Sequence, residues 1–364
     1  MSLSIGAGFS VGAGFTYNPS ITAVAGNTTT VSVNQNTAIT SFNPFSSVQF
    51  GTTPYTYFVS SGTLPTGISL NTSTGLVSGT PTISQSAANV TFSVQDASNQ
   101  VATTTSTVSF AVVAPSFTMQ YLVVAGGGAG GAGYPAFGSP WGGAGGGAGG
   151  LVACNATITS GTSFTVTVGS GGNFGGAGNP SSLVSTGVSI TATGGGNGHN
   201  SNGGAGTPGG SGGGGTWGAS GTGQGGAGTP GQGYPGGPVA NQGGSGGGGA
   251  GGTAGPNNIP GAVAPGGAGY TWPYTAYTYS TGGGGIIGGF AISGYPGQNY
   301  GDGGRGAGGG APNQQGGNGA AGVVILAVPT PNYPGSAPGA TVTTPPSAPG
   351  MTVITFTAPG TYTA

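Results

Sequence analysis

Residues 119–128 read Met-Gln-Tyr-Leu-Val-Val-Ala-Gly-Gly-Gly, an apolar strand that runs directly into a glycine tract. Its first half has the length and composition of a buried strand. The reverse transition occurs near the end of the chain, where the glycine-rich stretch 316–322 leads into Val-Val-Ile-Leu-Ala-Val at 323–328. Strands therefore enter and leave a glycine-rich region. Further strand candidates at 151–153, 164–168, 183–192 and 352–357 predict a β-sandwich built from residues 116–193 together with 320–364.

Glycine is distributed unevenly, because only 10 of the 91 glycines lie in residues 1–118. That change of composition predicts a domain boundary near Pro115. Runs of four glycines at 212–215, 246–249 and 282–285 break any strict three-residue repeat, which excludes collagen.

Another ordered state remains open to the glycine-dense stretch 194–319. A polyproline II helix leaves its N–H and C=O groups without internal partners, and packing several helices side by side would supply them. Only glycine lets backbones approach closely on every side. We expect a polyglycine II array braced by the β-sandwich, because ordering so much glycine is entropically unfavourable. A flexible linker is the alternative, although the stretch is very long for one within a compact domain.

Residues 19–115 have the alternation of short β-strands separated by polar turns, which is typical of a β-sandwich with antiparallel strands. Within them, LPTGISLNTSTGLVSGTP at 64–81 and FSVQDASN at 92–99 resemble the signature of the Ig-like domains found in bacterial surface and phage proteins. We expect Gly67, Gly75 and Gly79 to supply turns. Ile68, Leu70, Leu76 and Val77 are expected to face a core. The alternative is a turn-rich hairpin.

A second resemblance covers most of residues 119–364. QYLVVAGGG at 120–128, GGNGAAGVVIL at 316–326 and ITFTAPGTY at 354–362 resemble the glycine-rich domain that recurs in phage tail fibres and tail-associated adhesins. In that family the FTxxGTYT strand comes first, whereas here it comes last, which looks like a circular permutation. Such an order is tolerated if the strands are neighbours in space. Together the two resemblances imply an all-β chain without significant α-helix.

Charge is nearly absent, since the chain has one Lys or Arg, two Asp or Glu and one His among its 364 residues. The groups that perform proton transfer and metal ligation are therefore scarce, and we expect no enzyme, no cofactor and no metal. Nucleic acid is not expected as a partner, because phosphate binding needs several cations. We expect Cys154 to be a small buried residue. No apolar run is long enough to insert into a membrane.

Aromatic residues that interrupt the glycine tract are the candidate binding residues, because tyrosine and tryptophan offer a large contact area with a polar edge. Alternatively, these rings seal the glycine array, and one ring can do both. The candidate receptor-binding residues are Tyr134, Phe137, Trp141, Trp217, Tyr234, Trp272, Tyr274, Tyr277, Tyr279, Tyr295 and Tyr300.

The functional expectation is a structural virion protein of a bacteriophage, either a tail fibre or a tail-tip adhesin that binds the host. Its expected partners are other virion proteins and a host glycan or outer-membrane protein, and a homo-oligomer, by analogy with fibres a trimer, is expected. Residues 1–18 are expected to form an attachment segment. The N-terminus lacks a secretory signal, so we expect release by lysis. A purely structural head decoration or fibre protein is the first alternative, and a bacterial cell-surface adhesin is the second.

Overall fold

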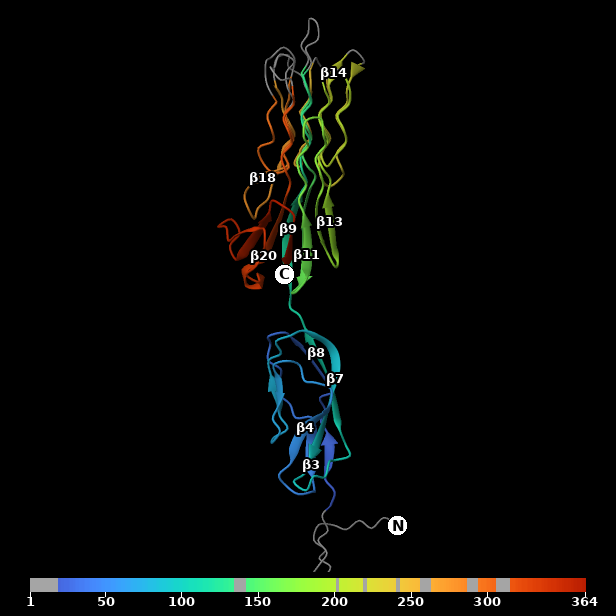
Figure 1. The fold of residues 1–364 in the computed structure, drawn as a ribbon, viewed down its shortest axis with the longest axis vertical. Coiled ribbons are helices and arrows are strands. Elements are labelled where there is room, and N and C mark those ends of the chain that lie inside the picture. The colour runs from blue at the N-terminus through green and yellow to red at the C-terminus, as the bar shows by residue number, and fades with distance from the viewer. Residues whose placement is uncertain are drawn as a thin grey trace, which may run out of the picture. The chain divides into compact units, whose positions relative to one another are not determined.

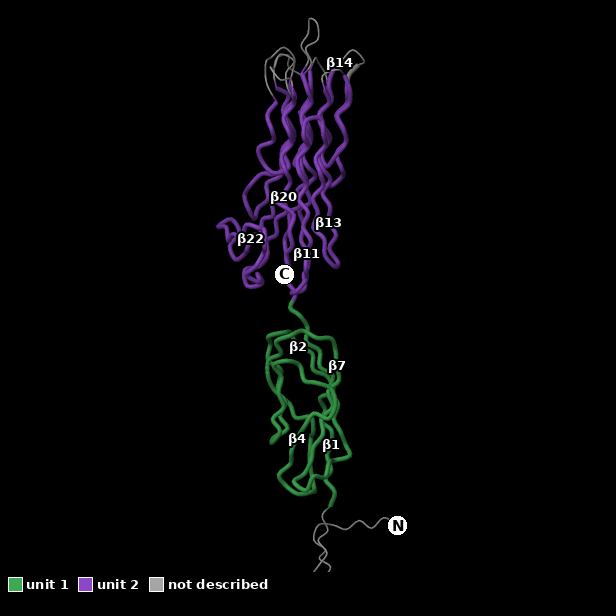
Figure 2. Tube along the Cα trace, in the orientation of Figure 1, with its two compact units in different colours: residues 1–115 green, residues 116–364 purple. Residues whose placement is uncertain are grey.

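The computed structural model describes residues 19–133, 142–200, 203–218, 221–239, 243–255, 263–286, 294–305 and 315–364. The chain divides into two compact units, Met1–Pro115 and Ser116–Ala364 (Figure 2). Over the described ranges it forms β-strands and one short 3-10 turn, η1 (Thr330–Asn332), without any α-helix. The all-β prediction is confirmed. Within the same ranges no helix is long and apolar enough to cross a membrane. The expected attachment segment, residues 1–18, lies outside the described residues.

The first unit is built from one four-stranded sheet and two strand pairs. The order in the sheet is β2-β8-β7-β4, and β2 runs parallel to β8 while the other neighbours are antiparallel. The expected antiparallel pattern therefore has one exception. The strands are β1 (Thr22–Ala25), β2 (Thr30–Asn34), β3 (Phe45–Gln49), β4 (Thr56–Ser61), β5 (Ile68–Leu70), β6 (Val77–Gly79), β7 (Gln85–Gln95) and β8 (Ser106–Val113).

The glycines of the 64–81 motif have the predicted role. Gly67, Gly75 and Gly79 all have positive φ, at 93°, 74° and 133°. A Cβ on Gly67 would lie 2.1 Å from the carbonyl oxygen of Thr80, so the hairpin leaves no space for a side chain there. Ile68 and Val77 are buried as expected, but Leu76 is exposed, because it precedes β6 and points away from the face that Val77 occupies.

The second unit contains a β-sandwich of two antiparallel sheets. The five-stranded sheet has the order β10 (Leu151–Thr159), β9 (Ser116–Val124), β20 (Val323–Pro329), β22 (Met351–Phe356) and β21 (Thr341–Thr343). The four-stranded sheet has the order β13 (Val188–Ala192), β12 (Ser181–Ser185), β11 (Ser163–Thr167) and β23 (Gly360–Thr363).

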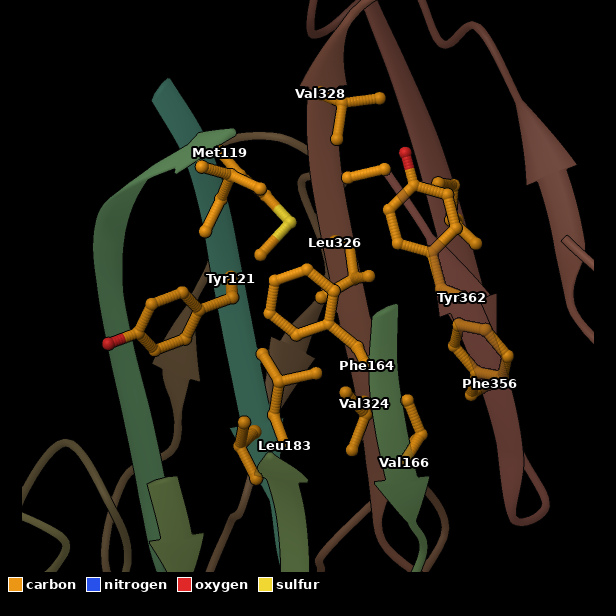
Figure 3. Packing of buried hydrophobic residues seen from close by; sticks show 14 of the residues in the cluster. Met119, Tyr121, Phe164, Val166, Leu183, Val324, Leu326, Val328, Phe356 and Tyr362 are labelled. Atoms are coloured by element: carbon orange, nitrogen blue, oxygen red, sulfur yellow. The ribbon is translucent and has the colours of Figure 1, made fainter. Parts of the chain in front are cut away.

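Large apolar side chains fill the space between these two sheets (Figure 3). Met119 and Leu326 project from the five-stranded sheet, and Phe164, Leu183 and Tyr362 project from the other. All five are essentially inaccessible to solvent. Alternate residues of each strand supply the core, as expected from the two-residue period of a β-strand.

The glycine tract forms extended segments that lie side by side (Figure 1). Consecutive N–H groups of segment 125–131 donate to three neighbours in turn: segments 144–150, 176–179 and 317–320. A partner that changes with a period of three is the geometry of the polyproline II helix, so the predicted polyglycine II array is confirmed. The donor–acceptor pairs are Ala125–Gly150, Gly126–Asn179, Gly127–Ala320, Gly128–Gly147, Ala129–Gly176, Gly130–Gly317 and Gly131–Ala144.

Segment 142–150, with the sequence GGAGGGAGG, has hydrogen bonds to six neighbouring segments. Three neighbours accept its N–H groups in rotation, and three others donate to its carbonyl groups. A Cβ on Gly145 would lie 1.9 Å from the carbonyl oxygen of Gly283, so the spacing of the segments excludes a side chain at that position. The acceptor segments are 193–199, 245–248 and 301–304, and the donor segments are 125–131, 211–214 and 283–286.

The array starts earlier in the chain than predicted. Segments 125–131 and 142–150 are predicted to belong to the sandwich but lie within the array, so the predicted boundary at residue 194 is wrong. The physical reason is continuity, because β9 runs straight into segment 125–131 and segment 142–150 runs straight into β10. Segments of the array therefore continue directly from strands of the sandwich.

The strand at the end of the chain, which the family places first, is not a direct neighbour of β9 as expected. β22 is separated from β9 by β20, and β23 belongs to the other sheet. The two ends of the unit nevertheless lie close together, at the turn between β10 and β11. Ser116 pairs with Thr159, and the N–H of Ala364 donates to the carbonyl of Thr162 at 2.9 Å. Because the ends meet there, a chain could begin or end at this turn without changing the fold.

Candidate functional site

The aromatic hairpin 270–279 covers the outer face of the five-stranded sheet. Its two short strands, β17 (Tyr270–Thr271) and β18 (Thr278–Tyr279), pair antiparallel. Trp272 and Tyr279 are each 3% exposed and pack against Leu122, Ile325 and other residues of β9, β20 and β22. The Tyr274 ring lies 5.0 Å from that of Trp272, measured between centroids. These rings seal the sheet, and they lie beside β9 and β20 rather than at the far end of the array, where β14 (Trp217–Gly218) lies (Figure 1).

Tyr277 and Tyr300 differ from these buried rings, because they are 71% and 39% exposed. With Tyr279 they line two adjoining cavities. The first cavity, of about 430 Å³, is also lined by Thr278, Gln298, Asn299, Ala320 and Ala321. The second cavity, of about 570 Å³, is also lined by Thr275, Ile325, Thr343, Pro345, Pro346, Ser347, Val353 and Thr355. Both volumes are within the range of small-molecule sites.

Asp302, one of the two carboxylates of the chain, anchors the loop that carries Gln298, Asn299 and Tyr300. Its Oδ1 accepts the backbone N–H of Thr281 at 2.8 Å, and its Oδ2 accepts that of Asn299 at 2.8 Å. Burial raises the pKa of this carboxyl, and the hydrogen bonds from the backbone N–H groups oppose that rise. The carboxylate therefore ties the loop to the segment that follows β18.

Further hydrogen bonds fix the three tyrosines and the second cavity. The N–H of Ser280 donates to the carbonyl of Tyr300 at 3.0 Å, and the hydroxyls of Thr275 and Tyr279 lie 2.9 Å apart. Burial raises the pKa of Tyr279, the hydrogen bond with Thr275 opposes that rise, and the neighbouring phenols of Tyr277 and Tyr300 add to it. On the opposite wall, the hydroxyl of Ser347 donates to the carbonyl of Tyr274 at 3.2 Å. The walls come from three distant parts of the sequence that are bonded together.

Three further candidates that the structure describes, Trp217, Tyr234 and Tyr295, do not line these cavities. Trp217 is partly buried in β14, and Tyr234 is 45% exposed within the array. Tyr295 is exposed, and the guanidinium carbon of Arg305 lies 4.2 Å from the centroid of its ring. Tyr134, Phe137 and Trp141 lie outside the described residues.

Sequence reasoning missed the polar and proline residues of the two cavities. Gln298 and Asn299 lie in the same interruption of the glycine tract as Tyr295 and Tyr300, but they are not aromatic. Pro345 lies between β21 and β22, beyond the glycine-dense stretch. One signal was present, because Asp302 is a rare carboxylate four residues after Gln298. A buried acid in an almost uncharged chain indicates a loop whose position matters.

The expectation for Cys154 is wrong, because the residue is exposed. β10 is an edge strand of the five-stranded sheet, and the middle of this strand is accessible to solvent. His199 is held by local contacts: its ring Nδ1 lies 2.6 Å from the carbonyl oxygen of Asn200 and 3.1 Å from the hydroxyl of Thr216. Across the ranges given above, His, Cys, Asp and Glu form no group of three that could hold a metal ion.

The arrangement is suited to recognition. The described residues that line the two cavities carry hydroxyl, amide, aromatic and aliphatic groups, and none of these residues is Asp, Glu, Lys, Arg, His or Cys. Neither a charged nucleophile nor a strong general base is therefore among them. Aromatic and amide groups on fixed walls are typical of sites that bind an uncharged, hydroxyl-rich or amphipathic ligand.

Comparisons with known proteins agree with both parts of the fold. A family described as "Putative Ig domain" matches residues 13–113. A family described as "Glycine-rich domain" matches residues 103–329, more than half of the chain, and this match stops before β22 and β23. No curated protein matches the chain. The strand-to-glycine transitions and the three-residue hydrogen-bond period agree with this match, and the chain belongs to the glycine-rich domain family.

Proposed function

We propose that the protein is a structural virion protein of a bacteriophage, a tail fibre or tail-tip adhesin that recognises the host cell surface. The observation that carries the proposal is the pair of charge-free cavities around the exposed rings of Tyr277 and Tyr300. Recognition sites commonly lie on loops that a rigid scaffold positions. The resemblance of QYLVVAGGG at 120–128 to phage adhesins supports the phage assignment.

A binding function fits the chemistry of the two cavities better than catalysis does. Their walls are held by the Asp302 and Ser347 hydrogen bonds, so little ordering entropy would be lost when a ligand binds. The proposal includes the surface of the particle as the location, other virion proteins as attachment partners and a homo-oligomeric assembly, by analogy with fibres a trimer.

A purely structural head decoration or fibre subunit is the second candidate. The burial of Trp272 and Tyr279 favours it, because two of the aromatic residues brought together by the hairpin pack on the sheet instead of facing solvent. The two candidates differ in whether Tyr277 and Tyr300 contact anything outside the chain.

Immunogold labelling of a lysate with antibodies raised against the purified chain tests the location. We expect gold at the tail or its tip. Gold over the capsid would support the decoration function, and gold on uninfected bacterial cells would support a bacterial surface adhesin. Either of these results would overturn the tail assignment.

Competition for adsorption tests the function. Purified chain added before the phage should reduce adsorption to the host, and the Tyr277→Ala/Tyr300→Ala double variant should not. Tyr234→Ala removes a ring of similar exposure outside both cavities, so it is the matched control and should compete like the unmodified chain. Equal competition by all three proteins would show that the cavities do not carry the binding.

A further inference from the structure

We infer that the two cavities form adjoining subsites for a neutral oligosaccharide that lies across Tyr277, Tyr279 and Tyr300. This inference rests on the proposed function, because it names the chemistry of the receptor that the same site would bind. The three tyrosines line both cavities. A ligand long enough to occupy both would pass over the exposed rings of Tyr277 and Tyr300, whereas Tyr279 is almost fully buried. A chain of several sugar units has that form.

The absence of charge in the lining selects a neutral ligand. Among the residues that the structure describes, none that lines either cavity is Asp, Glu, Lys, Arg or His. Asp302 is buried beneath the loop, and both of its oxygens accept backbone N–H groups. A uronate, a phosphate or a charged peptide would lose hydration without gaining an ionic partner. The hydroxyl groups of a neutral sugar need only hydrogen bonds.

Amide and hydroxyl groups of the first cavity could supply those hydrogen bonds. Within the described ranges, the side-chain amide of Asn299 has no hydrogen-bond partner in the protein. An amide offers two donors and one acceptor oxygen, a combination that matches neighbouring sugar hydroxyls. Gln298 is held through its Nε2, which donates to the carbonyl of Pro296 at 2.8 Å, and its Oε1 remains available as an acceptor. The first cavity is therefore the more polar subsite.

The second cavity has more apolar groups. Pro345 and Pro346 lie on one side, and Ile325 and Val353 of the sheet form its base. A pyranose has one face made mainly of C–H groups, and such a face packs on aromatic and aliphatic surfaces. The prolines have a fixed φ, so this wall is already ordered before binding. We expect a sugar unit to stack in the second cavity while its neighbour forms hydrogen bonds in the first.

The main competing occupant is a loop of a host outer-membrane protein. Stable protein interfaces bury about 800 Å² on each partner, usually over a broad surface. The tyrosine site consists instead of two concave cavities of about 430 and 570 Å³, which are dimensions of small-molecule sites. The shape therefore favours the oligosaccharide, and the protein loop becomes an outcome of the test.

The test uses the intact purified chain on an array of neutral and acidic oligosaccharides, followed by titration calorimetry with the strongest neutral hexasaccharide. We expect binding to at least one neutral glycan, with an affinity that hardly changes between low and molar NaCl. Tyr277→Ala and Tyr300→Ala should each weaken it roughly tenfold or more. Asn299→Ala should weaken it less, and Tyr234→Ala should leave it unchanged. Thermal unfolding curves of each variant show whether the fold is intact.

Several results would overturn the inference. These are no binding to any neutral glycan, binding to acidic glycans alone, and binding that Tyr277→Ala leaves intact. Treatment of host cells separates these failures from failure of the proposed function. If protease but not periodate destroys adsorption, and Tyr277→Ala still abolishes competition, the adhesin function stands and the receptor is a protein. If the chain binds a neutral glycan but never competes for adsorption, the site stands and the adhesin function falls.

Discussion

The sandwich and the glycine array of the second unit are built from the same chain segments but packed by opposite means. In β9 the residues pair with only two neighbours, β10 and β20, and alternate side chains fill the core between the sheets. Beyond Val124 the same chain donates to three neighbours in rotation and has almost no side chains. The sandwich is therefore held together by packed side chains, whereas the array is held together by backbone hydrogen bonds that form only because side chains are absent.

The energetic balance of the two regions differs accordingly. A buried hydrogen bond stabilises a fold by about 1 kcal/mol net, while ordering one backbone residue costs about 1–2 kcal/mol. An array of glycine backbones thus gains little by itself. Burial of large side chains such as Leu326 and Phe164 contributes roughly 1.5–3 kcal/mol each. In the described segments of the array such side chains are few, and Ile286 of segment 283–286 is one of them. This comparison explains why the segments of the array continue from strands of the sandwich.

The largest expected effect comes from removing volume in the sandwich. Phe164→Ala should destabilise the second unit by about 3–5 kcal/mol, because the ring is fully buried between the sheets. The three tryptophans, at 141, 217 and 272, all belong to this unit, so denaturant unfolding followed by tryptophan fluorescence measures the loss. Calorimetry should show an unchanged transition for the first unit. An undiminished fluorescence midpoint would mean that the sandwich does not brace the array.

Adding volume in the array should come next. Gly145→Ala should cost about 3 kcal/mol, because its Cβ would lie 1.9 Å from a backbone oxygen of a segment fixed by other neighbours. Gly252→Ala is the matched control, since its Cβ would meet no atom closer than 3.8 Å, and it should be neutral or slightly stabilising. Unfolding midpoints of the two variants give the comparison. Equal stability of both would contradict packing by close backbone approach.

Acid should affect the two units in opposite directions. Hydrogen bonds, first from the N–H of Thr52, lower the pKa of Asp96. The carboxylate therefore stabilises the first unit above the unfolded pKa of about 3.9, and this stabilisation is lost as the pH falls through the lowered pKa. Burial raises the pKa of Asp302, so its contribution is complete below about pH 3.9 and is lost as the pH rises through the raised value.

Lowering the pH from 7 to 4 should therefore stabilise the second unit through Asp302, while the first unit loses stability only below about pH 4. Fluorescence-detected unfolding at a series of pH values measures the former, and calorimetry measures the latter. Asp302→Asn should remove the gain that comes from this residue. If the unfolding midpoint of the Asp302→Asn variant rises between pH 7 and pH 4 as much as that of the unmodified chain, Asp302 is not the source of the gain.

The smallest expected effect is that of salt. With one cationic and two acidic side chains in 364 residues, there is almost nothing for salt to screen. Both unfolding transitions should move only slightly upward between low and molar NaCl, because salt mildly strengthens apolar burial. A clear decrease in either midpoint would reveal an electrostatic contact that stabilises the fold.

Much of the fold could be predicted from local patterns. The strand-to-glycine transition at 119–128, the turn glycines Gly67 and Gly79, and the three-residue geometry all depend on residues close in sequence. The extent of the array could not be predicted, because a glycine-rich sequence such as 142–150 is equally compatible with a loop and with a polyproline II helix that has six neighbours. Only the distant segments that surround them decide between the two.

The candidate site was predicted in part. Tyrosine content singled out Tyr277 and Tyr300, but the same rule also selected Trp272 and Tyr279, which are buried on the sheet. Sequence alone could not separate these pairs, because an exposed ring and a sealing ring have the same chemistry. Pro345 was missed because it reaches the second cavity from a loop that is distant in the sequence, and Asn299, next to Tyr300, was missed because only aromatic residues were selected.

The rotation of hydrogen-bond partners gives the glycine segments a three-residue register. In segment 125–131 every third N–H meets the same neighbour, so inserting one residue would turn each later donor toward the wrong segment. Inserting three residues would add one full turn of about 9 Å and restore every partner beyond the insertion. Length variation inside these segments should therefore accumulate in multiples of three, as it does in coding DNA, while the connections between segments are free of that constraint.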